Sequence, residues 1–282
     1  MKKILKIFIT IIVITLIFST PVIANNNNLK TSYLNYYYHK QMDNSEYKGY
    51  FLPTIKNVFG NTNMEIIKSN SCGLMTLTNI LDIMSEKEKG ELSGVTPVEL
   101  ANKYFVDDEN KIVLTYHNSE PALNSKVGLM SHTALYWLVD AIGEDTKLWE
   151  MKLIFGNNNS TFTSPVQKSE LVTMVTNLRK EVFDKNGIAI FSVMINGEWN
   201  ENYSEEYIPK NGYPKYMHFI VIMDMEMNKD GAARMLVVDS MGSEHNGYYG
   251  WVNSNTYTFA PTEYNSKLYT GILNVYGVIP TK

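Results

Sequence analysis

Apolar residues recur at helical spacing in the first half of the chain. After Cys72 they occupy four positions that lie zero, three, seven and ten residues from the first, namely Leu74, Leu77, Leu81 and Met84. This spacing places them on one face of a helix and predicts that this face is buried. Ser69, Asn70 or Ser71 would each be able to cap its start, because short polar side chains accept hydrogen bonds from the first N–H groups of a helix.

Three further patterns predict helices. Thr96 and Pro97 stand as the cap and the first position of a short one. Another covers residues 131–142 and ends at Gly143. A fourth is amphipathic and stops near residues 186–187. Its apolar face is marked by Leu171, Met174, Leu178 and Val182.

The pattern changes after residue 187. Three short apolar runs rich in β-branched residues follow, separated by Gly, Asn and Asp turns, at 188–195, 218–225 and 235–239. Unbroken apolar runs are typical of strands buried on both faces. Residues 247–252 and 271–279 add two more candidate strands. Since helices come first and strands second, the order predicts an α+β fold with a mostly antiparallel sheet.

No linker rich in Pro, Gly or Ser divides the chain. We therefore expect one domain over residues 51–282, preceded by an Asn- and Tyr-rich leader at 25–50. A long segment at 196–217 carries one tryptophan, four tyrosines and four glutamates just before His218. Two interpretations of this segment stay open, a flap that shapes a substrate site and a surface excursion that covers the sheet edge.

The N-terminus has the pattern of a secretory signal peptide. Three lysines precede an apolar stretch at 7–18, and Val22 and Ala24 supply the small-residue pattern of a cleavage site. Residues 1–24 are thus predicted to be removed, although an uncleaved N-terminal anchor is the alternative. We expect a secreted protein that does not bind a membrane after cleavage. Abundant Asn, Lys and Ile, together with the short signal, indicate a Gram-positive bacterium.

Composition excludes several classes of protein. The 25 Lys and Arg against 29 Asp and Glu give a net charge of −4, so no basic field attracts nucleic acid. A single cysteine excludes an intrachain disulfide framework, cysteine-rich zinc sites and iron–sulfur clusters. Four histidines show no metal-ligand spacing and are interpreted as surface or loop residues: His39, His117, His132 and His245. We expect no metal and no organic cofactor.

Cys72 is either a small buried hydrophobe or a reactive thiol. Its place at a predicted helix start favours an anion, because unpaired N–H groups and the helix dipole point there. His218 opens one predicted strand and Asp239 ends the next. A strand-end imidazole would take the thiol proton, and the carboxylate would orient the imidazole. The three residues therefore predict a Cys–His–Asp catalytic triad.

These residues resemble a known family. Ser71-Cys72-Gly73-Leu74-Met75-Thr76-Leu77 is similar to the Cys-Gly-x-x-Ser/Thr-Leu box of papain-like cysteine peptidases. His218-Phe219-Ile220-Val221 and Val237-Val238-Asp239-Ser240 resemble the later strands of the C39-like, double-glycine leader peptidase group. The resemblance implies a helical part that carries the cysteine, packed on a sheet that carries the histidine and aspartate. It also implies cleavage of peptide or amide bonds in a peptide or protein substrate through an acyl-enzyme.

The chain departs from this family at the oxyanion site. A glutamine usually stands about six residues before the cysteine, but position 66 is Ile. Asn70 or Ser69 would take its place, because an amide or hydroxyl can donate to an oxyanion. Two other functions remain open. One is a cell-wall amidase or transpeptidase that uses the same Cys–His chemistry. The other is a catalytically degenerate binding protein that uses its tyrosine-rich surface.

Overall fold

The structure is a computed structural model in which residues 38–40, 42–49, 68, 71–106, 132–156, 166–195, 216–241, 248–254, 262–264 and 267–282 are described. The predicted signal peptide at 1–24 lies outside the described residues. So do Ser69, Asn70 and residues 196–215 of the Tyr- and Glu-rich segment. Within the described part of the chain, no helix combines the length and the apolar character that crossing a membrane requires.

The helical part follows the predicted order. A short 3₁₀ helix η1 (Asn44–Tyr47) precedes three α-helices, α5 (Cys72–Lys89), α6 (Pro97–Tyr104) and α7 (His132–Thr146). Helix α5 ends where Gly90 adopts a left-handed backbone with φ +78°, a conformation that glycine tolerates best. Helix α6 begins with a capping box in which Thr96 and Glu99 each bind the other's backbone N–H, as its sequence indicates.

Helix α7 continues past Gly143, so the predicted end at that glycine is wrong. The glycine instead makes room for a neighbouring side chain. A Cβ at this position would lie 2.6 Å from Nε1 of Trp149. The same Nε1 donates a hydrogen bond of 3.0 Å to the carbonyl oxygen of Val139. Close packing, rather than helix termination, therefore explains the glycine.

The second half forms a six-stranded sheet of order β1-β8-β2-β3-β4-β5, in which every neighbouring pair is antiparallel. Its strands are β1 (Trp149–Phe155), β2 (Ile188–Ile195), β3 (Tyr216–Met227), β4 (Ala233–Asp239), β5 (Tyr248–Asn253) and β8 (Ile272–Pro280). Helix α8 (Leu171–Glu181) lies between β1 and β2 in the chain, flanked by the 3₁₀ helices η3 (Lys168–Glu170) and η4 (Phe183–Lys185). A separate pair is formed by β6 (Thr262–Tyr264) and β7 (Lys267–Tyr269). The predicted α+β class is confirmed.

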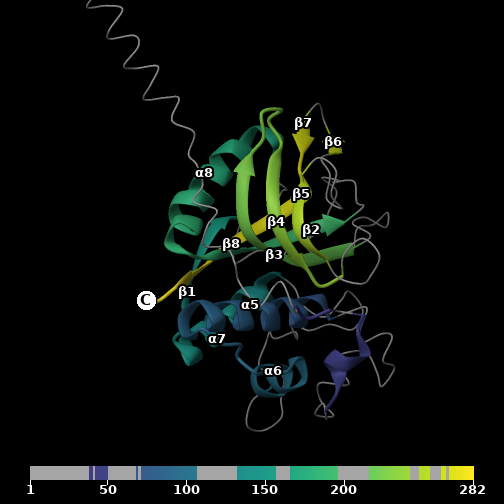
Figure 1. Cartoon of the computed structure of the whole chain (residues 1–282). Helices are drawn as coiled ribbons and strands as arrows, with labels where there is room; N and C mark the ends of the chain where they lie inside the picture. The colour runs from purple at the N-terminus through teal and green to yellow at the C-terminus, as the bar shows by residue number, and fades with distance from the viewer. Residues whose placement is uncertain are drawn as a thin grey trace, which may run out of the picture.

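Two hydrophobic cores lie on opposite faces of this sheet. Ile188 and Ile190 of β2 belong to the core shared with α5, α6 and α7. Ala189 and Phe191, which alternate with them, belong to the core shared with α8. Figure 1 shows α5, α6 and α7 gathered beneath the sheet, with α6 farthest from it. Because both faces are covered, the central strands β2, β3, β4 and β8 are largely apolar.

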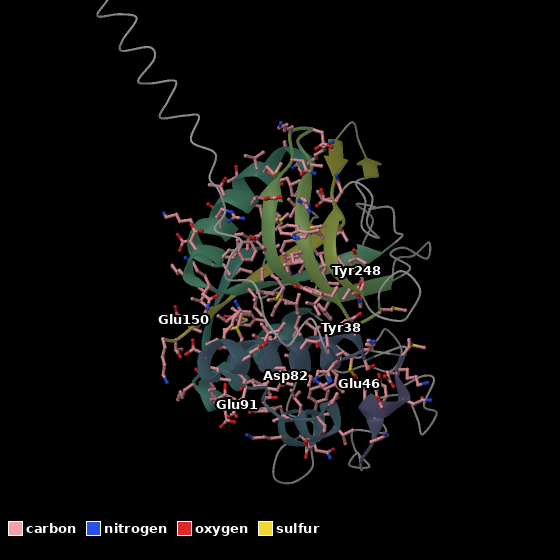
Figure 2. All side chains as sticks on the ribbon, in the orientation of Figure 1. Tyr38, Glu46, Asp82, Glu91, Glu150 and Tyr248 are labelled. Atoms are coloured by element: carbon pink, nitrogen blue, oxygen red, sulfur yellow. The ribbon has the colours of Figure 1, made fainter. Side chains whose placement is uncertain are left out.

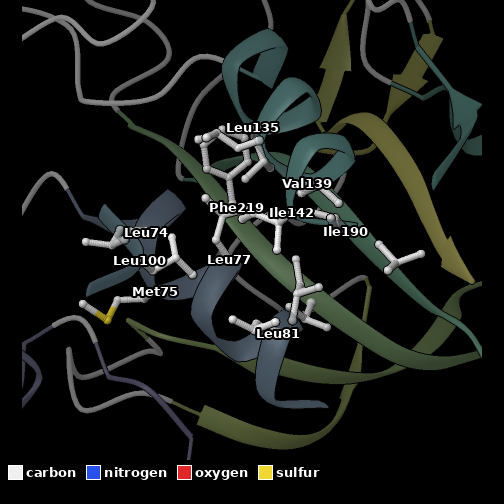
Figure 3. Packing of buried hydrophobic residues seen from close by; sticks show 14 of the residues in the cluster. Leu74, Met75, Leu77, Leu81, Leu100, Leu135, Val139, Ile142, Ile190 and Phe219 are labelled. Carbon is white, nitrogen blue, oxygen red and sulfur yellow. The ribbon is translucent and has the colours of Figure 1, made fainter. Parts of the chain in front are cut away.

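The packing of α5 on the sheet determines the position of the first residue of the helix. Figure 3 shows Leu74, Leu77 and Leu81 of this helix in one cluster with Phe219 of β3 and Ile190 of β2. All five side chains are almost completely buried. The first residue of α5, Cys72, is therefore held beside the first residues of β3.

Candidate active site

Cys72 is the first residue of α5 and follows the N-cap residue Ser71. It is a free cysteine with an intermediate exposure, packed against the larger core at one edge. A residue at this position projects from the positive end of the helix, where a thiolate is favoured over a thiol. The thiol is thus neither fully buried nor fully exposed.

His218 and Asp239 meet because β3 and β4 run antiparallel. The pairing of Val221 with Val238 places the start of β3 beside the end of β4. Nε2 of His218 lies 2.6 Å from Oδ1 of Asp239, and both side chains are almost completely buried. The same carboxylate oxygen accepts the N–H of Met241 at 2.9 Å. Asp239 is thereby fixed at the strand end and in turn fixes the ring of His218.

The thiol of Cys72 also acts on this imidazole. Burial alone would lower the pKa of His218, but the charge and hydrogen bond of Asp239, and then those of Cys72, raise it to about 10. Since Nε2 is bonded to Asp239, Nδ1 is the nitrogen left for the thiol. At neutral pH the imidazole therefore carries both protons, which is the state that pairs with a thiolate.

A direct bond holds the cysteine helix to the histidine strand. Oγ1 of Thr76, one turn after Cys72, donates a 3.0 Å hydrogen bond to the carbonyl oxygen of Phe219, the residue after His218. Both partners are buried. Thr76, the last residue of the Cys-Gly-x-x-Thr sequence, thus fixes the position of α5 along β3. It thereby also fixes the position of the thiol relative to the ring.

The first turn of α5 is not capped by Ser71. Its side chain makes no bond to the helix N–H groups. Instead Oγ of Ser71 donates to the carbonyl oxygen of Lys68 at 3.0 Å. The N–H groups at the start of the helix are therefore left to stabilise negative charge on or near Cys72. Ser69 and Asn70, the predicted oxyanion donors, lie outside the described residues.

Two tyrosines from residues 38–49 lie beside this triad, and sequence reasoning did not single them out. Burial, and then the negative charge of Asp239, raise the pKa of Tyr38. Burial raises the pKa of Tyr47 as well, with Glu46 and Cys72 among the charges that add to this effect. The Asn- and Tyr-rich composition of the segment gives no periodic signal for such a placement.

His39 lies in a stretch without helix or strand, as the prediction of a surface or loop residue allows, but it is buried, so the surface alternative is wrong. Its Nδ1 lies 2.6 Å from Oε2 of Glu46 and its Nε2 lies 3.0 Å from Oδ2 of Asp82. A signal was present in the sequence. Asn79 and Asp82 stand seven and ten residues after Cys72, so two polar residues share its face of an otherwise apolar helix.

Asp224 of β3 is remote from the candidate triad. Its Oδ1 accepts a 2.7 Å bond from Arg179 of α8, on the opposite face of the sheet. His132 begins α7, while His117 and His245 lie outside the described residues. Among the residues that the structure describes, no group of three His, Cys, Asp or Glu side chains is arranged to hold a metal ion.

Comparison with known proteins gives no match for this chain, whether against family models, curated proteins or solved structures. The resemblance to papain-like peptidases therefore depends on the residues of the chain itself. These are a thiol at a helix start, an imidazole at the start of a strand, and a carboxylate at the end of the next.

Proposed function

We propose that this protein is a secreted, papain-like thiol hydrolase of the C39-like type. It would cleave peptide or amide bonds in a peptide or protein substrate. One observation carries the proposal. The buried ring of His218 is bonded through Nε2 to the carboxylate of Asp239, and the thiol of Cys72 is near enough to raise the pKa of the same ring. This arrangement of nucleophile, base and orienting group supports covalent acyl transfer.

The proposed reaction starts from a thiolate–imidazolium pair. The raised pKa of His218 supports this state, because the ring keeps both protons while the sulfur carries the negative charge. The Cys72 sulfur attacks the substrate carbonyl carbon and the oxygen becomes an oxyanion. His218 then gives its Nδ1 proton to the leaving amine as the C–N bond breaks. The product of this half-reaction is a thioester on Cys72 and a neutral imidazole.

The second half-reaction uses the neutral ring as a base. His218 removes a proton from water, and the resulting hydroxide attacks the thioester carbon. The C–S bond breaks, the acid product leaves, and the thiolate–imidazolium pair is restored. Asp239 orients the ring throughout by accepting its Nε2–H.

The oxyanion would be stabilised at the start of α5. The backbone N–H of Cys72 is one donor, and the absence of a side-chain cap from Ser71 leaves the first turn available. Asn70 or Ser69 is proposed as the second donor in place of the missing upstream glutamine. Loss of one such donor typically costs about 2.7–4 kcal/mol of transition-state stabilisation, so Asn70→Ala and Ser69→Ala should show which residue acts.

The test is turnover by the secreted protein and its Cys72→Ala variant. Each is incubated with a proteome-derived peptide mixture, and new peptide termini are identified by mass spectrometry. We expect new termini with the wild type and none with the variant. Purified peptidoglycan is the second substrate, and Cys72-dependent release of amino groups from it alone would assign wall amidase chemistry instead. Activity with neither substrate, or equal activity of both proteins, would overturn the proposal.

Export is tested separately. The mature protein recovered from culture medium is expected to begin at Asn25, the residue after the predicted cleavage site. N-terminal sequencing gives this directly. A chain that still begins at Met1 and stays with the cells would contradict the secretion proposal without touching the chemistry.

A further inference from the structure

We propose that residues 38–49, here called the brace segment, hold the nucleophile in its reactive state, and that Tyr47 is a positioning residue that keeps Ser71 from capping α5. This inference rests on the proposed thiol hydrolase function. It assigns a role to a segment that comes before Cys72, His218 and Asp239 in the sequence. Figure 2 shows Tyr38, Glu46 and Asp82 close together where the brace segment meets the helical layer.

The brace segment is bound to α5 through main-chain and side-chain contacts. Asn79 pairs with the backbone of His39 in both directions. Its Oδ1 accepts the His39 N–H at 2.7 Å, and its Nδ2 donates to the His39 carbonyl oxygen at 3.2 Å. Asp82 binds the ring of His39 one turn later. Two successive turns of the helix that begins at Cys72 therefore hold the same residue.

A closed ion network fixes the shape of the brace segment. Glu46 binds the ring of His39 through Oε2 and the N–H of Lys40 through Oε1, at 2.6 and 3.1 Å. Both ring nitrogens of His39 therefore face carboxylate oxygens, one of Glu46 and one of Asp82. A neutral imidazole has only one N–H and would leave one of these contacts without a proton. The geometry thus calls for a doubly protonated His39, which satisfies both buried carboxylates.

The far end of the brace segment reaches the residue before the nucleophile. The hydroxyl of Tyr47 is hydrogen-bonded to Oγ of Ser71, and both side chains are buried. Ser71 has a single hydroxyl proton, which it donates to the carbonyl oxygen of Lys68. Tyr47 must therefore be the donor. Its phenol fixes the Ser71 hydroxyl in a direction away from the helix.

This direction matters because Ser71 stands at the N-cap of α5. Serine at this position ordinarily accepts the N–H of the second or third helical residue, here Gly73 or Leu74. Such a cap would satisfy N–H groups whose partial positive charge favours the Cys72 thiolate. Ser71 has a backbone of φ −100° and ψ 13°, whereas a capping serine has an extended backbone. The bond from Tyr47 holds Ser71 in this non-capping conformation and so leaves that charge to the sulfur. Without the phenol hydroxyl, Ser71 is free to move into the extended conformation and cap the helix.

The test measures the reactivity of Cys72, which needs no knowledge of the substrate. Because the chain has one cysteine, iodoacetamide modifies a single thiol. Alkylation rates are measured from pH 5 to 9 for the full chain and three variants, Tyr47→Phe, Ser71→Ala and the double variant. For Tyr47→Phe we expect a rate at pH 6 that is lower by roughly threefold or more, with the profile moved to higher pH.

The double variant distinguishes this role from packing. Ser71→Ala removes the competing cap, so its rate should stay near that of the wild type. The double variant should recover to the Ser71→Ala rate. A double variant as slow as Tyr47→Phe, or a Tyr47→Phe variant as fast as wild type, would overturn the inference alone. If wild-type Cys72 reacts no faster than a free cysteine, both this inference and the proposed function fail.

Discussion

Two buried histidines of this protein have similar surroundings but different second partners. His39 lies between two carboxylates, Glu46 and Asp82. His218 lies between the carboxylate of Asp239 and the thiol of Cys72. In each case burial alone would lower the pKa, and the partners raise it, to about 9 for His39 and to about 10 for His218. Both rings are therefore protonated at neutral pH.

The difference between them shows what makes a buried histidine chemically useful. Glu46 and Asp82 are buried and act as hydrogen-bond acceptors toward His39, so they offer its protons no reaction partner. Cys72 is partly exposed and is the proposed nucleophile, so a substrate would reach the sulfur and receive the His218 proton. One ring closes a buried ion network, and the other is the base of the proposed reaction.

The largest expected effect comes from breaking the His218 site. A free thiol with a pKa of about 8.5 is only about 0.1% ionised at pH 5.5. His218→Ala should therefore slow alkylation of Cys72 at that pH by roughly tenfold or more, after allowance for the greater nucleophilicity of a more basic thiolate. The control is Asp224→Asn, which alters the part-buried ion pair between Asp224 and Arg179 of α8. It should keep the wild-type rate, and an equal rate in His218→Ala would contradict the ion pair.

The next effect is on stability and concerns His39. His39→Ala would leave two buried carboxylates without their cation, so it should lower the free energy of unfolding at pH 6 by about 3–5 kcal/mol. Urea unfolding followed by circular dichroism measures this loss. Adding Glu46→Gln and Asp82→Asn to the same chain removes the uncompensated charges and should restore part of the stability. A loss below about 1 kcal/mol would show that the network is not a closed ion group.

Thr76→Val sharpens the comparison by loosening the link between α5 and the strand of His218. It removes the bond to the Phe219 carbonyl and should cost about 0.5–1.5 kcal/mol. Alkylation of Cys72 at pH 6 should also slow severalfold, because the thiol is no longer held in position beside the His218 ring.

Thr78→Val is the matched control for that substitution. Thr78 is buried on the same helix, but its hydroxyl bonds only to the Leu74 carbonyl of the preceding turn. A bond of this kind contributes little to helix stability. We expect a near-normal alkylation rate in Thr78→Val, and equal slowing in both variants would contradict a positioning role for Thr76.

The smallest expected effect, measured per pH unit, is the change in the free energy of unfolding with pH. A pKa raised by folding means that the folded state binds the extra proton, so the stabilisation is complete below about pH 6.5. For His39 it is lost as pH rises from 6.5 through about 9. Each such group changes the free energy of unfolding by at most about 1.4 kcal/mol per pH unit.

Urea titrations at a series of pH values test this sign. Between pH 6.5 and 9 the wild type should lose more stability than His39→Gln, because the variant lacks the first of the two rings. The contribution of His218 should persist in the variant and extend to about pH 10. Parallel curves for the two proteins would show that His39 does not titrate in this range.

The elements that could be predicted from sequence are those with a regular local pattern. Helix α5 follows from the spacing of its leucines, and β2, β3 and β4 follow from apolar runs. Strand β1 was not predicted, because it lies at the edge of the sheet and is only partly buried. It is defined by its pairing with β8, which lies more than a hundred residues later in the chain. An edge strand of this kind carries a weaker hydrophobic signal than a central one.

The site divides in the same way. Cys72, His218 and Asp239 each stand at the end of a predicted element, which is why local patterns single them out. The brace segment has no such pattern. Its buried His39 depends on Asn79 and Asp82, which lie 40 and 43 positions later in the chain. Their polar stripe on α5 indicates that something polar covers this face, but not which residues do.

By itself, then, the sequence determined the order of helices and strands, the α+β class and a set of three chemically suitable residues. These properties depend on neighbours within a few turns or strand positions. Only the tertiary structure decided that one histidine closes on two carboxylates while another meets the thiol. Contacts such as that of Thr76 with Phe219 join residues 143 positions apart, and they form only when helix and sheet pack face to face.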